Sequence, residues 1–196
     1  MEHYFTNNEN LKSELRDIKY SYDEYNFVFK SDNGVFSKNR IDYASEFLVK
    51  TFLSNKKREY KSILDVGCGY GFIGITLSKI LNIHVDMCDI NKRCIHLTKM
   101  NIDLNKVDAN VFESDIYDNI DKTYDLIITN PPIRVGKEIL YKFLKGGIEK
   151  LNKDGELWFV ISKDQGAKSV KKELDLSYNC EVIEKSKGFW IFLVKK

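Results

Sequence analysis

Short apolar runs alternate with amphipathic segments between residues 62 and 162, and this order constrains the fold more than any other feature of the chain. Runs rich in Val, Ile, Leu and aromatic residues predict buried strands at 62–69, 84–90, 110–115, 124–130 and 155–162. Apolar residues recur at helical spacing between them, at 72–81, 94–105 and 138–151. Strands that alternate with helices predict an α/β fold, with a mostly parallel sheet covered by helices on both faces.

The segment at 180–196 departs from this alternation. "CEVIEKSKGFWIFLVKK" predicts two strands joined tightly at Lys187-Gly188, which would add an antiparallel strand at or near one edge of the sheet. Before the first core strand, "YNFVFKSDNGVFS" (25–37) predicts a β-hairpin with its turn at Asp32-Asn33-Gly34, because Asn and Gly accept positive φ. A helical pattern follows at 41–53.

The chain has 196 residues, of which 43% are hydrophobic, enough to bury one core. No linker or repeat separates the two parts of the chain, so we expect one domain (1–196), in which an N-terminal extension (1–58) packs on a core (59–196). No apolar window is long enough to cross a bilayer, and residues 1–17 lack the apolar centre of a signal peptide. We therefore expect a cytoplasmic protein without a membrane partner.

The four cysteines, at 68, 88, 94 and 180, form no CxxC pair and have no histidine cluster near them. Their spacing predicts reduced, packed thiols and neither a metal site nor a disulfide framework. Charge is uneven: residues 134–196 carry 14 Lys and Arg against nine Asp and Glu. Such a basic part is compatible with phosphate contacts, and equally with lysines on solvated helix faces.

The glycine-rich stretch "LDVGCGYGFIG" (64–74) is the first indication of a ligand-binding site. Gly67, Gly69 and Gly71 follow a predicted strand and precede a predicted helix, so the backbone there can turn sharply and approach a ligand closely. Asp65 lies in that strand, and Asp89 ends the next one, where a carboxylate can accept both hydroxyls of a ribose. The pattern predicts a nucleoside-bearing cofactor; a dinucleotide remains open, although the spacing is GxGxG and not GxGxxG.

Four motifs in order, "DVGCGYG", "CDIN", "ESD" and "NPPI", resemble those of the class I S-adenosylmethionine-dependent methyltransferases over about residues 60–196. The resemblance implies a Rossmann-like seven-stranded sheet with an antiparallel terminal strand, S-adenosylmethionine as cofactor and no metal. It implies that Asp115 contacts the adenine amino group. The cofactor-binding residues it implies are Asp65, Gly67, Gly69, Gly71, Asp89, Ile90, Asp115, Ile116 and Asn130.

The fourth motif contains the two prolines of the chain, in "TNPPIRVGK" (129–137). Proline fixes φ and has no N–H, so Pro131-Pro132 stiffens a segment whose carbonyl oxygens are left without a neighbouring donor. In the resembling enzymes this motif receives a planar amine: the Asn130 side-chain oxygen and the Pro131 carbonyl would accept its two N–H groups. The implied catalytic residues are Asn130, Pro131 and Pro132, without a metal or a strong base.

Two further stretches, "DNGVFSKNRIDYAS" (32–45) and "NPPIRVGKE" (130–138), resemble the ribosomal small-subunit RNA guanine-N2 methyltransferase family in its compact form. That resemblance implies 16S ribosomal RNA, or the small ribosomal subunit, as partner. Ile133 stands where many such enzymes have an aromatic residue, so we expect Phe36 to stack on the base, unless it is a core residue. The substrate-binding residues expected are Phe36, Lys38, Arg40, Ile133, Arg134 and Lys137.

Two other functions stay open from the sequence. One is a protein glutamine-amide N-methyltransferase, which also uses NPP, although Ile133 disfavours it. The other is a domain that binds cofactor or RNA without catalysis, which is disfavoured because such a domain would not need the intact motifs that this chain has. DNA adenine methylation is weaker, because no insert for target recognition is visible.

Overall fold

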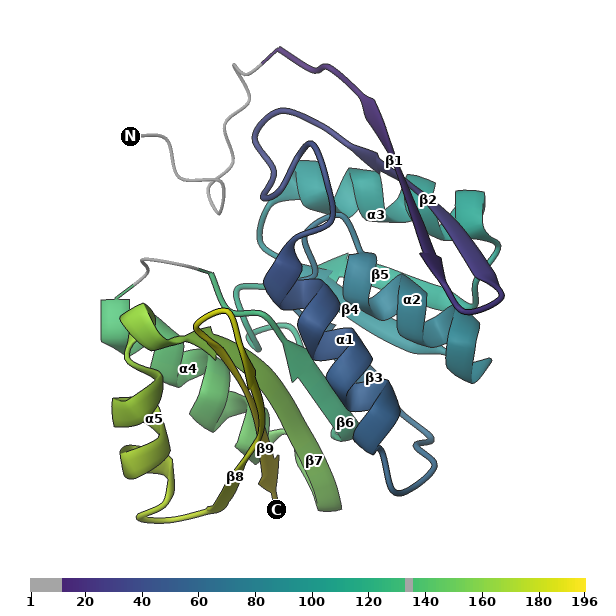
Figure 1. The fold of residues 1–196 in the computed structure, drawn as a ribbon. Helices are drawn as coiled ribbons and strands as arrows, with labels where there is room; N and C mark the ends of the chain where they lie inside the picture. Colours follow the sequence, from purple (N-terminus) through teal and green to yellow (C-terminus); the bar gives the residue numbers. More distant parts are fainter. Residues whose placement is uncertain (1–11, 133–135) are drawn as a thin grey trace.

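The computed structural model describes residues 12–132 and 136–196, and its centre is a seven-stranded sheet (Figure 1). The strands lie in the order β5-β4-β3-β6-β7-β9-β8, and β9 is antiparallel to both of its neighbours while the other pairs are parallel. This confirms the predicted sheet. The strands are β3 (Ile63–Val66), β4 (Val85–Asp89), β5 (Ala109–Glu113), β6 (Tyr124–Thr129), β7 (Leu151–Ser162), β8 (Asn179–Ser186) and β9 (Phe189–Lys195).

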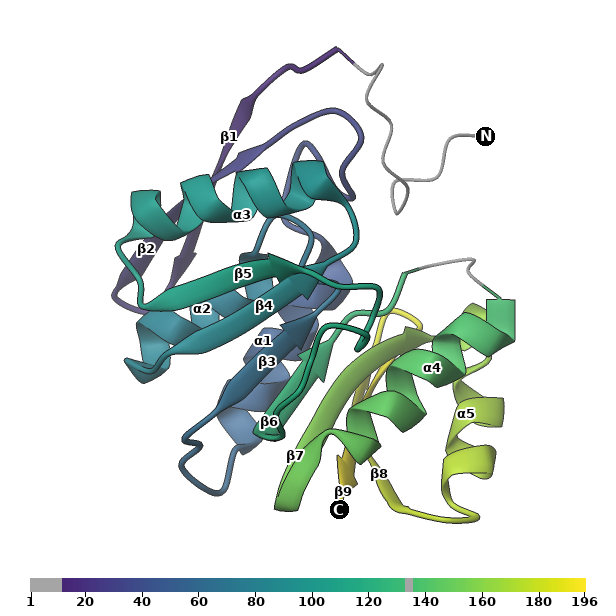
Figure 2. The same cartoon turned by 180° about the vertical axis from the view of Figure 1, so that it is seen from behind.

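Helices cover both faces of the sheet, as the views from the front and from behind show (Figures 1 and 2). Side chains alternate along the strands, so Trp158 of β7 enters one core and its neighbour Phe159 enters the other. The first core packs under α1 (Tyr43–Asn55), α2 (Phe72–Leu81) and α3 (Lys92–Asn105). The second packs under α4 (Gly136–Glu149) and α5 (Ala167–Leu174).

The N-terminal hairpin forms, but the predicted position of its turn is wrong. Its strands are β1 (Arg16–Tyr22) and β2 (Tyr25–Ser31), and the chain reverses at Asp23, which has a φ of +47°. Asp32 instead closes the open end of the hairpin, because its carboxylate accepts hydrogen bonds from the backbone N–H groups of Glu14 and Asn33. The segment from Asp32 onward therefore leaves the hairpin and leads to α1.

Two asparagines of α3 attach this hairpin to the core. The side chain of Asn105 accepts from the N–H of Val28 and donates to its carbonyl, at 3.1 and 2.8 Å. Asn101 pairs in the same way with Lys30, at 2.6 and 3.0 Å. Side-chain amides thus replace a neighbouring strand along β2, which satisfies backbone groups that would otherwise need water.

Element boundaries agree closely with the predicted ones, with a few differences. The helix at 72–81 is confirmed, whereas α4 covers 136–149 and β7 already begins at Leu151. The hairpin of β8 and β9 turns at Lys187-Gly188 as predicted, both residues having positive φ. Helix α5 and the short 3₁₀ helix Lys163–Gln165 were not predicted.

All four cysteines are buried and free, which confirms the expected packed thiols. Within residues 12–132 and 136–196, no helix combines the length and apolarity needed to cross a membrane.

Candidate active site

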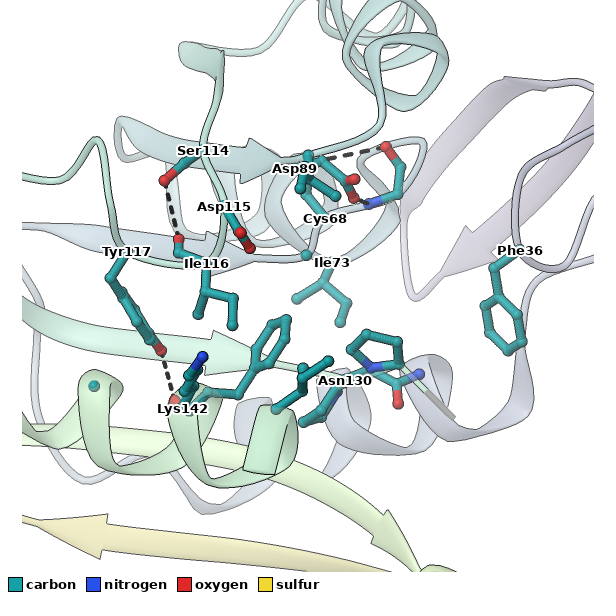
Figure 3. A pocket seen from close by; sticks show the side chains of 18 of the residues that line it. Phe36, Cys68, Ile73, Asp89, Ser114, Asp115, Ile116, Tyr117, Asn130 and Lys142 are labelled. Carbon is teal, nitrogen blue, oxygen red and sulfur yellow. Dashed lines mark hydrogen bonds between the residues drawn. The ribbon is translucent and has the colours of Figure 1, made fainter. Parts of the chain in front are cut away.

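A cavity of about 820 Å³ lies at the carboxyl ends of four neighbouring strands (Figure 3). Its lining includes Gly67 after β3, Asp89 at the end of β4, Asp115 after β5 and Asn130 after β6. Strands β4 and β5 lie on one side of β3, and β6 lies on its other side, so the order in which strands are added to the sheet reverses at β3. Open α/β sheets bind their ligands at such switch points.

The glycine turn after β3 combines a packing residue and an open one. Gly67, Gly69 and Gly71 all have positive φ, at +71°, +59° and +90°. A Cβ on Gly71 would lie 2.8 Å from Ile75 Cδ1 and 2.9 Å from Thr98 Cγ2, whereas one on Gly69 would meet nothing within 4 Å. Gly67 and Gly69 line the cavity and Gly71 does not. Gly69 therefore lets a ligand approach the backbone, and Gly71 lets α2 and α3 pack.

Asp89 fastens this turn to the end of β4. One of its carboxylate oxygens accepts from the Gly69 N–H at 2.9 Å, and the other accepts from the Asn91 N–H at 2.8 Å. Burial raises the pKa of Asp89, and these backbone donors act against the rise. Each oxygen has a second lone pair, so the carboxylate still has capacity to accept hydroxyl groups of a ligand in the cavity.

Asp65 lies beneath the turn and does not line the cavity. It is fully buried, and its Oδ2 accepts from the Gly74 N–H at 2.9 Å while Oδ1 has no hydrogen-bond partner. Burial, with a smaller contribution from the charge of Asp89, raises the pKa of Asp65 to about 7. The arrangement makes Asp65 a support for the start of α2, in contrast to the expected direct contact with the cofactor.

Ile116, in the segment after β5, and Ile90, which directly follows β4, give the cavity an apolar wall. The segment after β5 also adds two exposed carboxylates to the lining, Asp115 and Asp118. Ile116 has a φ of +52°, an uncommon conformation for a β-branched residue. Ser114 holds it there, since its hydroxyl donates to the Ile116 carbonyl at 3.2 Å and accepts from the Asn119 N–H at 3.1 Å.

Asn130 lies on the opposite side of the cavity from Asp89 and Asp115 (Figure 3). Its Nδ2 donates to Asp42 Oδ2 at 3.0 Å and to Ser45 Oγ at 2.9 Å. Pro131 is buried and Pro132 is half-buried, and both line the cavity.

Asp42 and Ser45 belong to the site: both lie in the stretch 32–45 that resembles the guanine-N2 methyltransferase family, although no role was predicted for either residue. Asp42 is the N-cap of α1, and its side chain accepts from the Ser45 N–H. The spacing Asp-x-x-Ser before an apolar helical pattern is an N-cap signal. It predicts where the helix begins, but it does not predict that the start of this helix contacts Asn130.

The expected substrate residues separate into three groups. Phe36 is half-buried and lines the cavity. Lys38, Arg40 and Lys137 are exposed and lie outside its lining. Ile133 and Arg134 lie outside the described residues.

One wall was not predicted at all. Helix α4 contributes Tyr141, Lys142, Phe143 and Lys145, together with Tyr117 from the loop after β5. The Tyr117 hydroxyl donates to the Phe143 carbonyl at 2.8 Å, which fixes this wall to the loop (Figure 3).

Acidic side chains outnumber basic ones along the lining that the structure describes. Lys142 and Lys145 are its two cationic residues, and its carboxylates are Asp42, Asp89, Asp115, Asp118, Glu138 and Glu149. Such a surface favours a ligand that carries positive charge. Among residues 12–132 and 136–196, no group of three or more His, Cys, Asp or Glu is placed to hold a metal ion.

Comparisons with known proteins identify relatives of this chain. The YbxB protein of Bacillus subtilis (strain 168), itself uncharacterised, is 36% identical over 200 residues, which cover 100% of this chain and 98% of that protein. Ribosomal RNA small subunit methyltransferase C of Buchnera aphidicola subsp. Baizongia pistaciae is 33% identical over 145 residues. Those residues cover 71% of this chain and 44% of that protein, so the chain spans about half the length of such relatives.

A solved structure of the T. thermophilus 16S rRNA N2 methyltransferase, in complex with AdoMet and guanosine, has the same fold with a TM-score of 0.83 at 19% identity. The superposition covers 93% of this chain and 50% of that one. The family model described as "Methyltransferase small domain" matches residues 26–193. The chain therefore belongs to the methyltransferase small domain family.

Proposed function

We propose that this protein transfers the methyl group of S-adenosylmethionine to the exocyclic N2 amine of a guanine in small-subunit (16S) ribosomal RNA. The observation that carries the proposal is the position of Asn130 and Pro131 at the carboxyl end of β6, facing the same cavity as Asp89 and the glycine turn. The names of the methyltransferase C relatives, and the guanosine bound to the structural neighbour, support the choice of substrate.

The described residues fit S-adenosylmethionine. The open backbone at Gly69 leaves room for close approach, the Asp89 carboxylate has spare lone pairs for ribose hydroxyls, and Ile90 and Ile116 offer apolar surface for a flat ring. The acidic lining suits a cationic ligand. When bound, S-adenosylmethionine supplies an electrophilic methyl group on a sulfonium sulfur.

The catalytic contribution of the chain is orientation. The lone pair of a guanine N2 amine is delocalised into the ring, so the amine is a weak nucleophile. The Asn130 Oδ1 and the Pro131 carbonyl would accept its two N–H groups, hold the nitrogen in line with the methyl group and stabilise the positive charge that develops on it. Once the N–CH₃ bond has formed and the S–CH₃ bond has broken, the cationic nitrogen would release its proton to water, so the chain need not supply a strong base.

Target binding would involve Phe36 and four basic residues that lie close in the sequence to residues of the lining. Phe36 lines the cavity and offers an aromatic face for the base. Lys38, Arg40, Arg134 and Lys137 would contact phosphates. In this proposal residues 1–196 form one methyltransferase domain that acts in the cytoplasm, where ribosomal RNA is found.

Nucleoside analysis tests the proposal directly. Small-subunit RNA from a strain lacking the gene should lose N2-methylguanosine at one position, and the purified protein with labelled S-adenosylmethionine should restore it. Both naked RNA and isolated small subunits should be supplied, because either can be the substrate. Labelled N6-methyladenosine or methylglutamine in place of N2-methylguanosine would overturn the assignment of the substrate.

A further inference from the structure

We infer that Asp42 and Ser45, at the start of α1, are positioning residues that fix the side-chain amide of Asn130 with its oxygen free for the target amine. The inference rests on the proposed function of Asn130. It adds a role for a segment of the chain 85 to 88 residues away, which lies outside the motif itself.

The orientation of the amide follows from the chemistry of its partners. An asparagine side chain has one donor end and one acceptor end, and it can turn either toward a neighbour. The carboxylate of Asp42 only accepts hydrogen bonds, so it faces the Asn130 NH₂ group, at 3.0 Å. The reversed amide would bring two oxygens together at that distance.

Ser45 completes the arrangement. Its hydroxyl proton is directed to Asp42 Oδ2 at 3.0 Å, which leaves a lone pair to accept the second Asn130 N–H at 2.9 Å. The Ser45 backbone N–H also donates to Asp42 Oδ2, at 2.8 Å, so the helix cap holds the carboxylate in place. Both hydrogens of the Asn130 NH₂ group are therefore used.

The oxygen end of Asn130 stays available. Asn130 Oδ1 accepts no hydrogen bond from any residue that the structure describes, and it is not among the buried atoms without a partner. Asn130, Asp42 and Ser45 all line the cavity. Hydrogen bonding of the NH₂ group to a carboxylate also polarises the amide, which makes its oxygen a stronger acceptor.

The first test deletes one hydroxyl. Ser45→Ala removes an acceptor for Asn130 and keeps Asp42 as the cap, so the fold should persist. We expect kcat to fall about ten- to a hundredfold, because misplacement of a reacting group is costly, while the Kd of S-adenosylmethionine stays unchanged. Thr51→Val is the matched control: it deletes a buried hydroxyl of the same helix, which donates to Glu184 at 2.8 Å, away from the cavity.

The second test reverses the polarity of the pair. Asn130→Asp places two carboxylates together, so its activity should be far below wild type. Adding Asp42→Asn removes the repulsion, and the double variant should be about tenfold or more faster than Asn130→Asp alone, because residues in contact are energetically coupled. If Asp42 only caps α1, Asp42→Asn will leave the rate of the Asn130→Asp variant unchanged.

An independent readout does not need activity. In protein with ¹⁵N-labelled asparagine, the NH₂ signals of Asn130, assigned by their loss in Asn130→Ala, should exchange slowly with solvent. Exchange should speed up in Ser45→Ala and stay slow in Thr51→Val. The inference would be overturned if the Asn130 NH₂ group exchanged at the same rate in wild type, Ser45→Ala and Thr51→Val. It would also be overturned if the kcat of Ser45→Ala equalled that of Thr51→Val.

Failure of the proposed function gives a different pattern. The proposed function would be contradicted if the wild-type protein left guanine N2 unmethylated, or if the Asn130→Ala variant kept full activity. Either result would count against it whatever the hydrogen-exchange data show.

Discussion

The carboxylate of Asp89 accepts a hydrogen bond from the backbone N–H of Gly69 at 2.9 Å, across 20 residues of sequence. This bond joins the glycine turn after β3 to the end of β4, so one side chain both shapes the turn and faces the cavity. Its loss should therefore affect ligand binding in two ways.

Asp89→Ala should weaken S-adenosylmethionine binding about ten- to a hundredfold, since losing hydrogen bonds to a charged group costs about 1.5–3 kcal/mol. Asp89→Asn keeps an acceptor for the Gly69 N–H and should lose less. Calorimetric titration measures both. An unchanged dissociation constant in folded Asp89→Ala would exclude the ribose role of Asp89.

Alanine at Gly69 and at Gly71 should have different consequences. Both residues have positive φ, so each substitution costs about 1–2 kcal/mol of backbone strain. Gly71→Ala adds contacts below 3 Å with Ile75 and Thr98 and should lower the melting temperature more. Gly69→Ala, whose new methyl group meets open space, should mainly weaken ligand binding. Thermal unfolding and titration of both variants check this, and the reverse ranking would contradict it.

Asn130→Ala should separate catalysis from cofactor binding. It deletes an acceptor for the target amine and leaves Asp89 and the glycine turn intact, so kcat should fall about 10²- to 10³-fold with little change in cofactor affinity. Transfer of labelled methyl to small-subunit RNA is the assay. A variant that methylates at the wild-type rate would reduce the motif to a rigid turn.

The buried Asp65 should make stability depend on pH. Its pKa of about 7 in the folded protein exceeds its ordinary value of 3.8, so between these values the folded state holds a proton that the unfolded chain has lost. Unfolding free energy should therefore fall as pH rises from about 4 to about 7, by at most about 1.4 kcal/mol per pH unit.

Asp65→Asn should reduce this slope, because it stays neutral and keeps an oxygen for the Gly74 N–H. It should also be more stable than wild type at pH 8. Urea unfolding at pH 5, 6, 7 and 8 gives the two curves. Parallel curves would show that Asp65 is not the titrating group.

Four basic residues that lie close in the sequence to the lining should contribute to the salt dependence of RNA binding. If Lys38, Arg40, Arg134 and Lys137 contact phosphates, changing all four to alanine should reduce the salt slope by about one unit per contact. Lys57 and Lys106, exposed beyond the C-terminal ends of α1 and α3, provide a matched control pair. An unchanged slope in the fourfold variant would leave these residues as solvated charges.

The sequence predicted a mostly parallel sheet, the order of its elements along the chain and a candidate site at the carboxyl ends of its strands. These follow from local signals: apolar periodicity marks the strands and helices, and glycines and prolines mark the turns. The carboxyl ends of parallel strands meet at one edge of a sheet, and the resemblance to methyltransferase motifs singled out Gly67, Asp89, Asp115 and Asn130 at those ends.

Which atoms come into contact follows from tertiary packing. The bonds of Asn130 to Asp42 and Ser45, and of Asp32 to Glu14, join residues far apart in the chain, and no periodicity encodes such partners. Tertiary packing also decides whether an aspartate side chain is buried and supports a helix or lines the cavity and can contact a ligand. Asp65 and Asp89 occupy similar strand ends in sequence, yet one is sealed beneath the glycine turn and the other lines the cavity.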